Sequence, residues 1–146
     1  TTIMECHGHD HDHSHADEPG YSLHQYIDHP SCFCLNEHAP NMGRDVLKPH
    51  DDRLTNTPSL LSEDDDPELL LHIAFTEAVN VKSVCIRGSS SDENARATTW
   101  GPRRVKLFCN RDDLDFETAR DLAPAMALEL LPPEHDEDGS VDYPVR

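Results

Sequence analysis

The amino-acid sequence predicts an all-β sandwich. Three observations lead to this fold class: apolar and polar residues alternate in several short stretches, long polar connections separate them, and helical periodicity is nearly absent. Successive side chains of a strand point to opposite faces, so an apolar residue at every second position gives the strand one face to bury. Short strands joined by polar loops are typical of two packed sheets.

The first two predicted strands lie between residues 69 and 86. In the first, four apolar residues share one face, which leaves His72 on the opposite face as an exposed strand residue: Leu69, Leu71, Ile73 and Phe75. In the second, Val81 to Ile86, both faces are apolar. The connection between the two stretches is short, so we expect a hairpin whose second strand lies inside the sandwich.

Two further strands are predicted near the end of the chain. Val105, Leu107 and Cys109 alternate, with Phe108 on the opposite face, and a last alternating run follows: Met126, Leu128 and Leu130. Between them, residues 115–120 are predicted to form one helical turn capped by Asp115, because an Asp side chain can accept from the first free backbone N–H groups.

The segments before residue 69 hold few apolar residues. Residues 1–20 contain no Leu, Val, Phe or Tyr, and we predict a disordered, His-rich, acidic tail there and a single domain over residues 21–146. Ser22 begins a capping-box pattern before a short helix that ends at Pro30. Residues 36–68 form a long loop region ending in an acidic run, residues 63–68.

The charge and the cysteines limit the classes of function. A net charge of −17 argues against nucleic acids and anionic membranes as partners. It favours a soluble monomer, or attraction to a basic surface on a partner protein. Five cysteines at irregular spacing, with no apolar signal-peptide core before them, predict a reducing cytoplasmic or nuclear compartment.

Two groups of residues could bind a transition metal. The tail carries one cysteine and five alternating histidines: Cys6, His7, His9, His11, His13 and His15. This spacing differs from that of structural zinc sites and is compatible only with weak, adaptable binding of Zn²⁺ or Ni²⁺. Cys32 and Cys34 could pair or join a metal site with His29 or His38, but cysteine is often simply buried, which we favour here.

The sequence carries no recognisable catalytic arrangement. It lacks the G-x-S-x-G, H-E-x-x-H, P-loop and G-x-G-x-x-G motifs, and its many carboxylates lie in runs typical of solvated loops. We therefore expect no enzyme activity and no cofactor.

Several of these segments, in order, resemble the PITH family, the proteasome-interacting thioredoxin domain. The resemblance covers about Tyr21 to Arg146. It runs through short segments along the chain: residues 34–37, 69–70, 75–88, 101–110, 115–117 and 127–130. It implies a galactose-binding-like β-sandwich (jelly roll) that associates with the proteasome and has no known catalysis of its own. Since family members continue beyond the position of Arg146, we expect this chain to lack the last strands.

The choice of partner-binding residues rests on polar position rather than on the resemblance, and two alternative functions stay open. Exposed polar positions are the candidates for partner binding: Asn36, Glu37, Asp64, Asp65 and Asp66. One alternative is a metal-binding protein that acts through the His-rich tail. Another is a carbohydrate-binding module, for which Trp100 is the one aromatic residue in a suitable loop.

Overall fold

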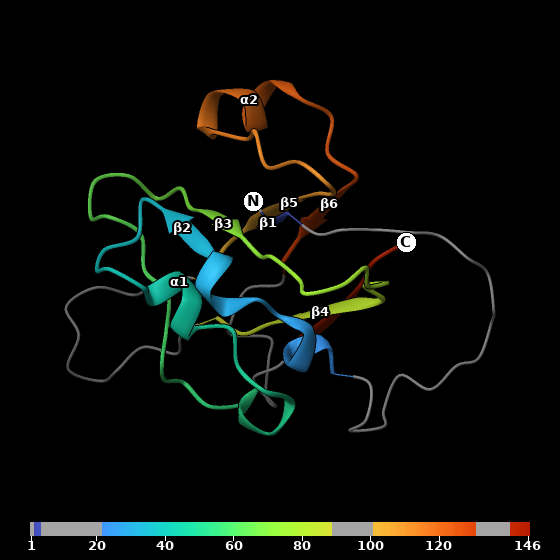
Figure 1. Cartoon of the computed structure of the whole chain (residues 1–146). Helices are drawn as coiled ribbons and strands as arrows, with labels where there is room; N and C mark the ends of the chain where they lie inside the picture. The colour runs from blue at the N-terminus through green and yellow to red at the C-terminus, as the bar shows by residue number, and fades with distance from the viewer. Residues whose placement is uncertain (1, 4–21, 89–100, 131–140) are drawn as a thin grey trace.

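The computed structural model describes residues 2–3, 22–88, 101–130 and 141–146. Within these ranges the regular structure is mostly β-strand with a few short helical segments, in agreement with the predicted all-β class (Figure 1). The strands are β1 (Thr2–Ile3), β2 (Phe33–Leu35), β3 (Leu70–His72), β4 (Ser83–Ile86), β5 (Arg104–Phe108), β6 (Met126–Glu129) and β7 (Val141–Pro144). The helices are α1 (Met42–Asp45) and α2 (Phe116–Asp121), with 3-10 turns at Leu23–Tyr26, His29–Ser31 and His50–Asp52.

The strands form two sheets. The larger has five strands in the order β2-β3-β1-β5-β6, and the smaller pairs β4 with β7. Strand β1 runs parallel to both of its neighbours, whereas the other pairs are antiparallel. Thr2–Ile3 thus differ from the predicted disordered tail, because their backbone groups pair with β3 and β5. The rest of that segment, residues 4–20, lies outside the described residues.

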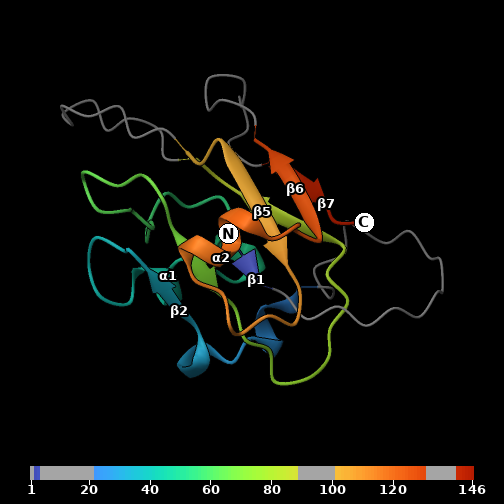
Figure 2. The same cartoon turned by 90° about the horizontal axis from the view of Figure 1, so that it is seen from above.

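The core lies on both faces of β5. On one face Phe108 joins Leu70 of β3 and packs against Leu114 and Ala119, which come from the α2 segment. Figures 1 and 2 both show α2 over this part of the sheet. On the other face three buried residues pack against Ile86 and Tyr143 of the smaller sheet: Val105, Leu107 and Leu128. The two sheets therefore share a core through β5 and β6.

The predictions for β5, β6 and the helix between them are confirmed. Val105 is 7% and Leu107 2% exposed, and Phe108 is buried on the opposite face. Asp115 begins α2 with a capping box, in which its side chain accepts from the Thr118 backbone and Thr118 Oγ1 accepts from the Asp115 backbone N–H. Lys106 Nζ donates to the carbonyl oxygens of Ala119 and Arg120 at the other end of this helix.

The predicted hairpin between residues 69 and 86 is wrong. Strand β3 pairs with β2 and β1, whereas β4 pairs with β7 in the other sheet. The predicted burial of the strand also differs, because Leu70 is fully buried while Leu71 and Ile73 are half-buried. Helix α2 covers the face of Leu70, and α1 packs over the opposite face, where a Cβ on Gly43 would meet Leu71. Alternation cannot identify the inner face of a strand that is covered on both sides.

The short helix predicted after Ser22 is present as a 3-10 turn, with Ser22 Oγ accepting from the His24 backbone. Across the part of the chain that the structure describes, we find no helix with the length and hydropathy needed to cross a membrane.

Candidate functional site

Strand β2 lies at one edge of the five-stranded sheet and carries two exposed apolar side chains. Phe33 is 41% and Leu35 is 36% exposed, and they pair with His72 and Leu70 of β3. Opposed residues of antiparallel strands point to the same face, so Phe33 and Leu35 share the face of Leu70. Helix α2 covers Leu70 completely and leaves the two residues of β2 open to solvent.

His72 completes this surface. Its ring stacks on that of Phe33, with centroids 4.7 Å apart and an interplanar angle of 15°. Burial lowers the pKa of His72, and the negative charge of Asp112 opposes this effect, so the imidazole is mostly neutral at pH 7. The prediction of an exposed strand residue is wrong, because Phe33 partly covers the ring and its Nδ1 atom is buried. We name the surface of Phe33, Leu35 and His72 the β2 patch.

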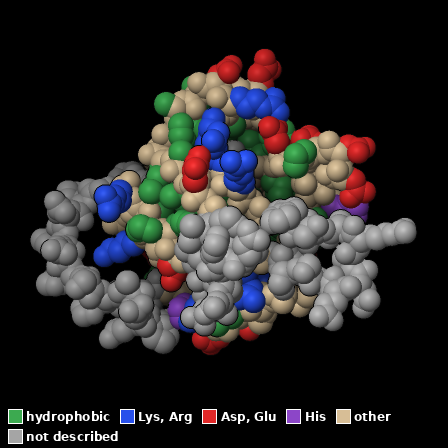
Figure 3. All heavy atoms as spheres, turned by 180° about the vertical axis from the view of Figure 1, so that it is seen from behind, with side chains coloured by type: hydrophobic (Ala, Val, Ile, Leu, Met, Phe, Trp, Pro, Cys, Tyr) green, Lys and Arg blue, Asp and Glu red, His purple; other side chains and the backbone are tan. Residues whose placement is uncertain are grey.

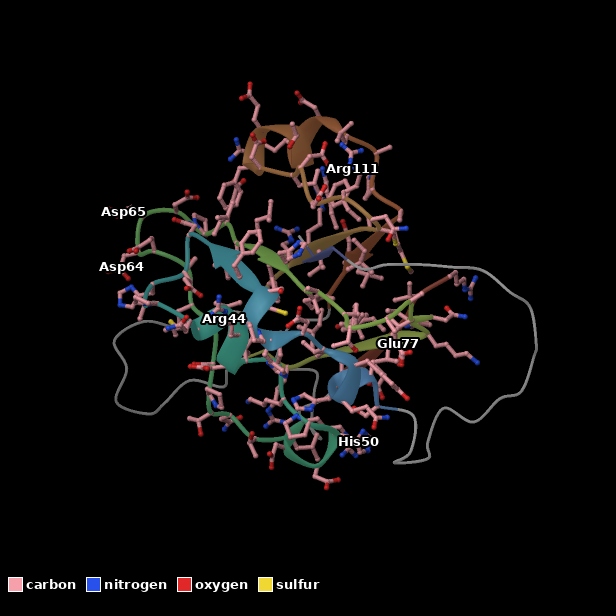
Figure 4. All side chains as sticks on the ribbon, in the orientation of Figure 1. Arg44, His50, Asp64, Asp65, Glu77 and Arg111 are labelled. Carbon is pink, nitrogen blue, oxygen red and sulfur yellow. The ribbon has the colours of Figure 1, made fainter. Side chains whose placement is uncertain are left out.

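An acidic loop, residues 63–68, is tied to the end of β2 by Asn36. The Asn36 Nδ2 group donates to the carbonyl oxygens of Asp66 and Glu68 at 3.0 and 2.8 Å, and the Asn36 carbonyl accepts from the Glu63 backbone at 3.1 Å. Asn36 has a φ of 66°, in the left-handed region that asparagine tolerates better than most residues. Figure 4 shows Asp64 and Asp65 pointing outward at this end of the molecule.

Glu37, the next residue, holds the following turn. Its Oε1 atom accepts from the Asn41 backbone at 2.7 Å, and Oε2 accepts from the Gly43 backbone at 2.8 Å. These bonds satisfy N–H groups at the start of α1 that have no acceptor within the helix. Two of the five predicted partner-binding residues, Asn36 and Glu37, thus have side chains committed to local structure, while those of Asp64, Asp65 and Asp66 are exposed.

One ion pair links the acidic loop to α2, and another lies within the segment just before α2. Arg120 of α2 pairs with Glu68 at the end of the acidic loop, and Arg111 pairs with Asp113 through two hydrogen bonds of 2.7 and 2.9 Å. Figure 3 shows Lys and Arg side chains interspersed with Asp and Glu around the end of the molecule that carries α2. The surface is therefore locally mixed in charge although the chain is strongly acidic.

Comparison with known proteins identifies the family. The family model described as PITH domain matches residues 13–146, which is most of the chain. This chain belongs to the PITH family. The confirmed resemblance includes β2, the acidic loop and α2, so the β2 patch lies within the PITH match.

Curated relatives of this PITH chain include proteins from an insect and an amphibian. It is 34% identical over 123 residues to PITH domain-containing protein CG6153 of Drosophila melanogaster, covering 84% of this chain and 53% of the relative. It is 31% identical over 127 residues to PITH domain-containing protein 1 of Xenopus laevis, covering 86% and 54%. The chain thus spans about half the length of the curated relatives that it matches. No solved structure matches it.

The cysteines of the PITH domain fit the structural interpretation better than the chemical one. Cys32 is fully buried; its Sγ donates to the Asp28 carbonyl at 3.2 Å and accepts from the Ala74 backbone at 3.3 Å. Burial raises the pKa of Cys34 to about 11, and the charge of Glu37 adds to the effect. Among the described residues, no three His, Cys, Asp or Glu side chains converge as a metal site, His29 and His38 included.

The structure does not describe the remaining residues that the sequence suggested as binding sites. The tail residues proposed for metal binding lie outside the described ranges: Cys6, His7, His9, His11, His13 and His15. Trp100, named for carbohydrate binding, also lies outside them. Conversely, the sequence interpretation missed the β2 patch. The alternation of Phe33 and Leu35 was available as a signal, but an alternating pattern does not show whether its face is covered.

Proposed function

We propose that this chain is a non-catalytic protein-interaction module that associates with the proteasome. Membership of the PITH family carries the proposal, since the resemblance to that family implies proteasome association. The β2 patch supports a binding role: two large apolar side chains of one short strand, Phe33 and Leu35, are exposed beside charged loops. Apolar residues with a polar rim are typical of protein interfaces.

The proposal extends to the fold and the compartment. The packing of the β4–β7 sheet against β5 and β6 supports a galactose-binding-like β-sandwich for the domain. Action in the cytoplasm or nucleus is supported by the thiols of Cys32, Cys34 and Cys85, which suit a reducing compartment.

Co-sedimentation tests the association directly. The purified chain at micromolar concentration would be mixed with purified proteasome particles in low-salt buffer and separated on a glycerol gradient. We expect the chain to move from the top of the gradient into the proteasome fractions. If the chain stays at the top, the proposed association is wrong.

Two controls separate a specific interaction from charge or unfolding. A folded acidic protein of similar size and net charge should stay at the top of the gradient. Leu70→Asp places a carboxylate in a fully buried position and should unfold the domain. If either control sediments with the proteasome as strongly as the wild-type chain, the association is not a property of the folded domain, and the proposal fails.

A further inference from the structure

The β2 patch continues the buried apolar face of the sheet onto the surface. Leu70 is fully buried against Phe108, Leu114 and Ala119, and its cross-strand neighbour Leu35 on the same face is 36% exposed. Phe33 lies two residues farther along β2 and is 41% exposed. Its ring stacks on that of His72, so one face of the ring lies against the sheet. The patch is therefore an apolar surface directly beside the buried core, and side chains already packed in the free protein lose less entropy on binding.

Carboxylates border this patch at two ends. At the end next to Leu35, Asn36 anchors the acidic loop with its exposed side chains of Asp64, Asp65 and Asp66. At the other end, Asp112 is close enough to His72 to influence its protonation. Arg120 and Arg111 are already paired, with Glu68 and Asp113. None of Asp64, Asp65, Asp66 and Asp112 forms a salt bridge with another described residue, although Arg111 and Arg120 are close enough to feel the charges of Asp112 and Asp66.

The negative charge around the β2 patch indicates which kind of molecule can bind there. A second copy of the chain would bring a net charge of −17 against the same acidic rim. Residues 5–18 and 134–138 of the chain itself are rich in Asp and Glu, so electrostatics also disfavours them as intramolecular covers. Opposite charges at the rim of an interface steer association and select against like-charged partners.

We propose that the β2 patch docks a protein segment that carries apolar side chains flanked by Lys or Arg. The apolar residues of the segment contact Phe33 and Leu35, and its cations lie toward Asp112 at one end and Asp64 to Asp66 at the other. The neutral His72 adds apolar ring surface without repelling the cations. This inference rests on the proposed interaction role, and it names the surface and the chemistry of the partner.

A synthetic peptide provides the probe. It carries two leucines separated by one serine, with two lysines at each end, and a fluorescein label for anisotropy measurements. A second peptide replaces the leucines with serine, and a third replaces the lysines with glutamate. We expect the 146-residue chain to bind the first peptide and to bind the other two at least about 10-fold more weakly.

Substitutions locate the binding surface. Phe33→Ser with Leu35→Ser should reduce affinity for the first peptide by about 10-fold or more. Leu54→Ser is the matched control, since Leu54 is 45% exposed but lies outside the patch. Asp64→Asn with Asp65→Asn should reduce affinity and flatten its salt dependence, whereas Asp51→Asn with Asp52→Asn removes the same charge elsewhere. Unchanged melting temperatures establish that each variant is folded.

The outcomes distinguish this inference from the proposed function. Binding that ignores Phe33 and Leu35 but follows net charge overturns the inference, and so does a patch-dependent dimer in sedimentation velocity. If the Phe33 and Leu35 variant loses the peptide but still sediments with the proteasome, the patch binds basic apolar segments and the proteasome contacts lie elsewhere. If the wild-type chain binds the peptide but never sediments with the proteasome, the proposed function fails while the inference stands.

Discussion

Polar side chains near β2 hold the backbone in place. Asn36 secures the acidic loop through two hydrogen bonds and occupies a left-handed conformation, while Glu37 accepts two backbone N–H groups at the start of α1. Cys32 likewise exchanges hydrogen bonds with the backbone of residues 28 and 74. The residues that the sequence suggested as binding or redox groups therefore act mainly by hydrogen-bonding to the backbone of neighbouring loops.

Substitution of Asn36 separates the effect of its side-chain hydrogen bonds from the effect of its left-handed backbone conformation. Asn36→Gly keeps easy access to positive φ and loses the side-chain hydrogen bonds, whereas Asn36→Ala also incurs the strain of a left-handed residue. We expect both to lower the free energy of unfolding, Asn36→Ala by about 1–3 kcal/mol and Asn36→Gly by less. Urea denaturation measures both. A glycine variant at least as unstable as the alanine variant would contradict the left-handed geometry.

The reactivity of Cys34 should rise with pH over a higher range than that of an ordinary thiol. Thiolate is the reactive species, and burial together with Glu37 raises the pKa of Cys34 to about 11. Its alkylation rate by iodoacetamide should therefore still rise about 10-fold per pH unit between pH 8 and 10, since the group remains mostly protonated there. Peptide mapping by mass spectrometry gives the rate at this residue.

The control for that experiment is the same cysteine in urea. Unfolding removes burial, so the pKa of Cys34 should return to the ordinary thiol value of 9.0. The alkylation rate should then level off once the pH rises above that value. Glu37→Gln should shift the native profile to lower pH because it removes a nearby negative charge. A native profile that already levels off at pH 9 would show that Cys34 is not buried in this way.

Secondary-structure elements stabilise each other mainly by covering both faces of the larger sheet. Helix α2 lies over Leu70 and Phe108, and its ends are satisfied by Asp115 and Lys106. Helix α1 is only four residues long, and it packs on the face of Cys34 and Leu71 through Gly43. A helix this short owes its stability to tertiary contacts rather than to its own hydrogen bonds.

Gly43→Ala should push α1 away from the sheet. A Cβ at this position would lie 2.4 Å from the Cys34 Cβ and 3.2 Å from Leu71 Cδ1. Because the Cys34 Cβ belongs to a strand and cannot move freely, we expect the free energy of unfolding to fall by about 1–3 kcal/mol. Asp45→Ala, an exposed change in the same helix, is the control for helix propensity. A thermal or urea melt in which Gly43→Ala matches the wild-type chain would contradict this close packing.

The stability of the whole molecule depends on its net charge. A net charge of −17 on 146 residues produces self-repulsion that favours the expanded chain, and salt screens this repulsion. Raising NaCl from about 10 to 150 mM at pH 7.5 should therefore increase the melting temperature by a few degrees, as the screening length falls from about 30 to 8 Å. Differential scanning calorimetry measures the change.

The same salt series near the isoelectric point serves as the control. The sequence pI is about 4.8, so net repulsion is small there and added NaCl should have little effect on the melting temperature. If the melting temperature at pH 7.5 is flat or falls with salt, local ion pairs such as that of Arg104 and Glu129 outweigh the net charge.

The sequence by itself determined the features that depend on neighbours along the chain. The strands at β5 and β6 follow from alternation, and α2 follows from the Asp115 cap; the acidity and the family resemblance are also properties of the sequence alone. Asp64, Asp65 and Asp66 were expected to be exposed, and the structure places them on the surface.

Only the tertiary structure decided which strands pair and which apolar faces stay open. Thr2–Ile3 insert between β3 and β5, and β3 and β4 lie in different sheets. Phe33 and Leu35 are exposed because α2 ends its cover at Leu70. Strand pairing and burial depend on contacts between residues far apart in sequence, whereas periodicity records only the alternation of side chains within each strand.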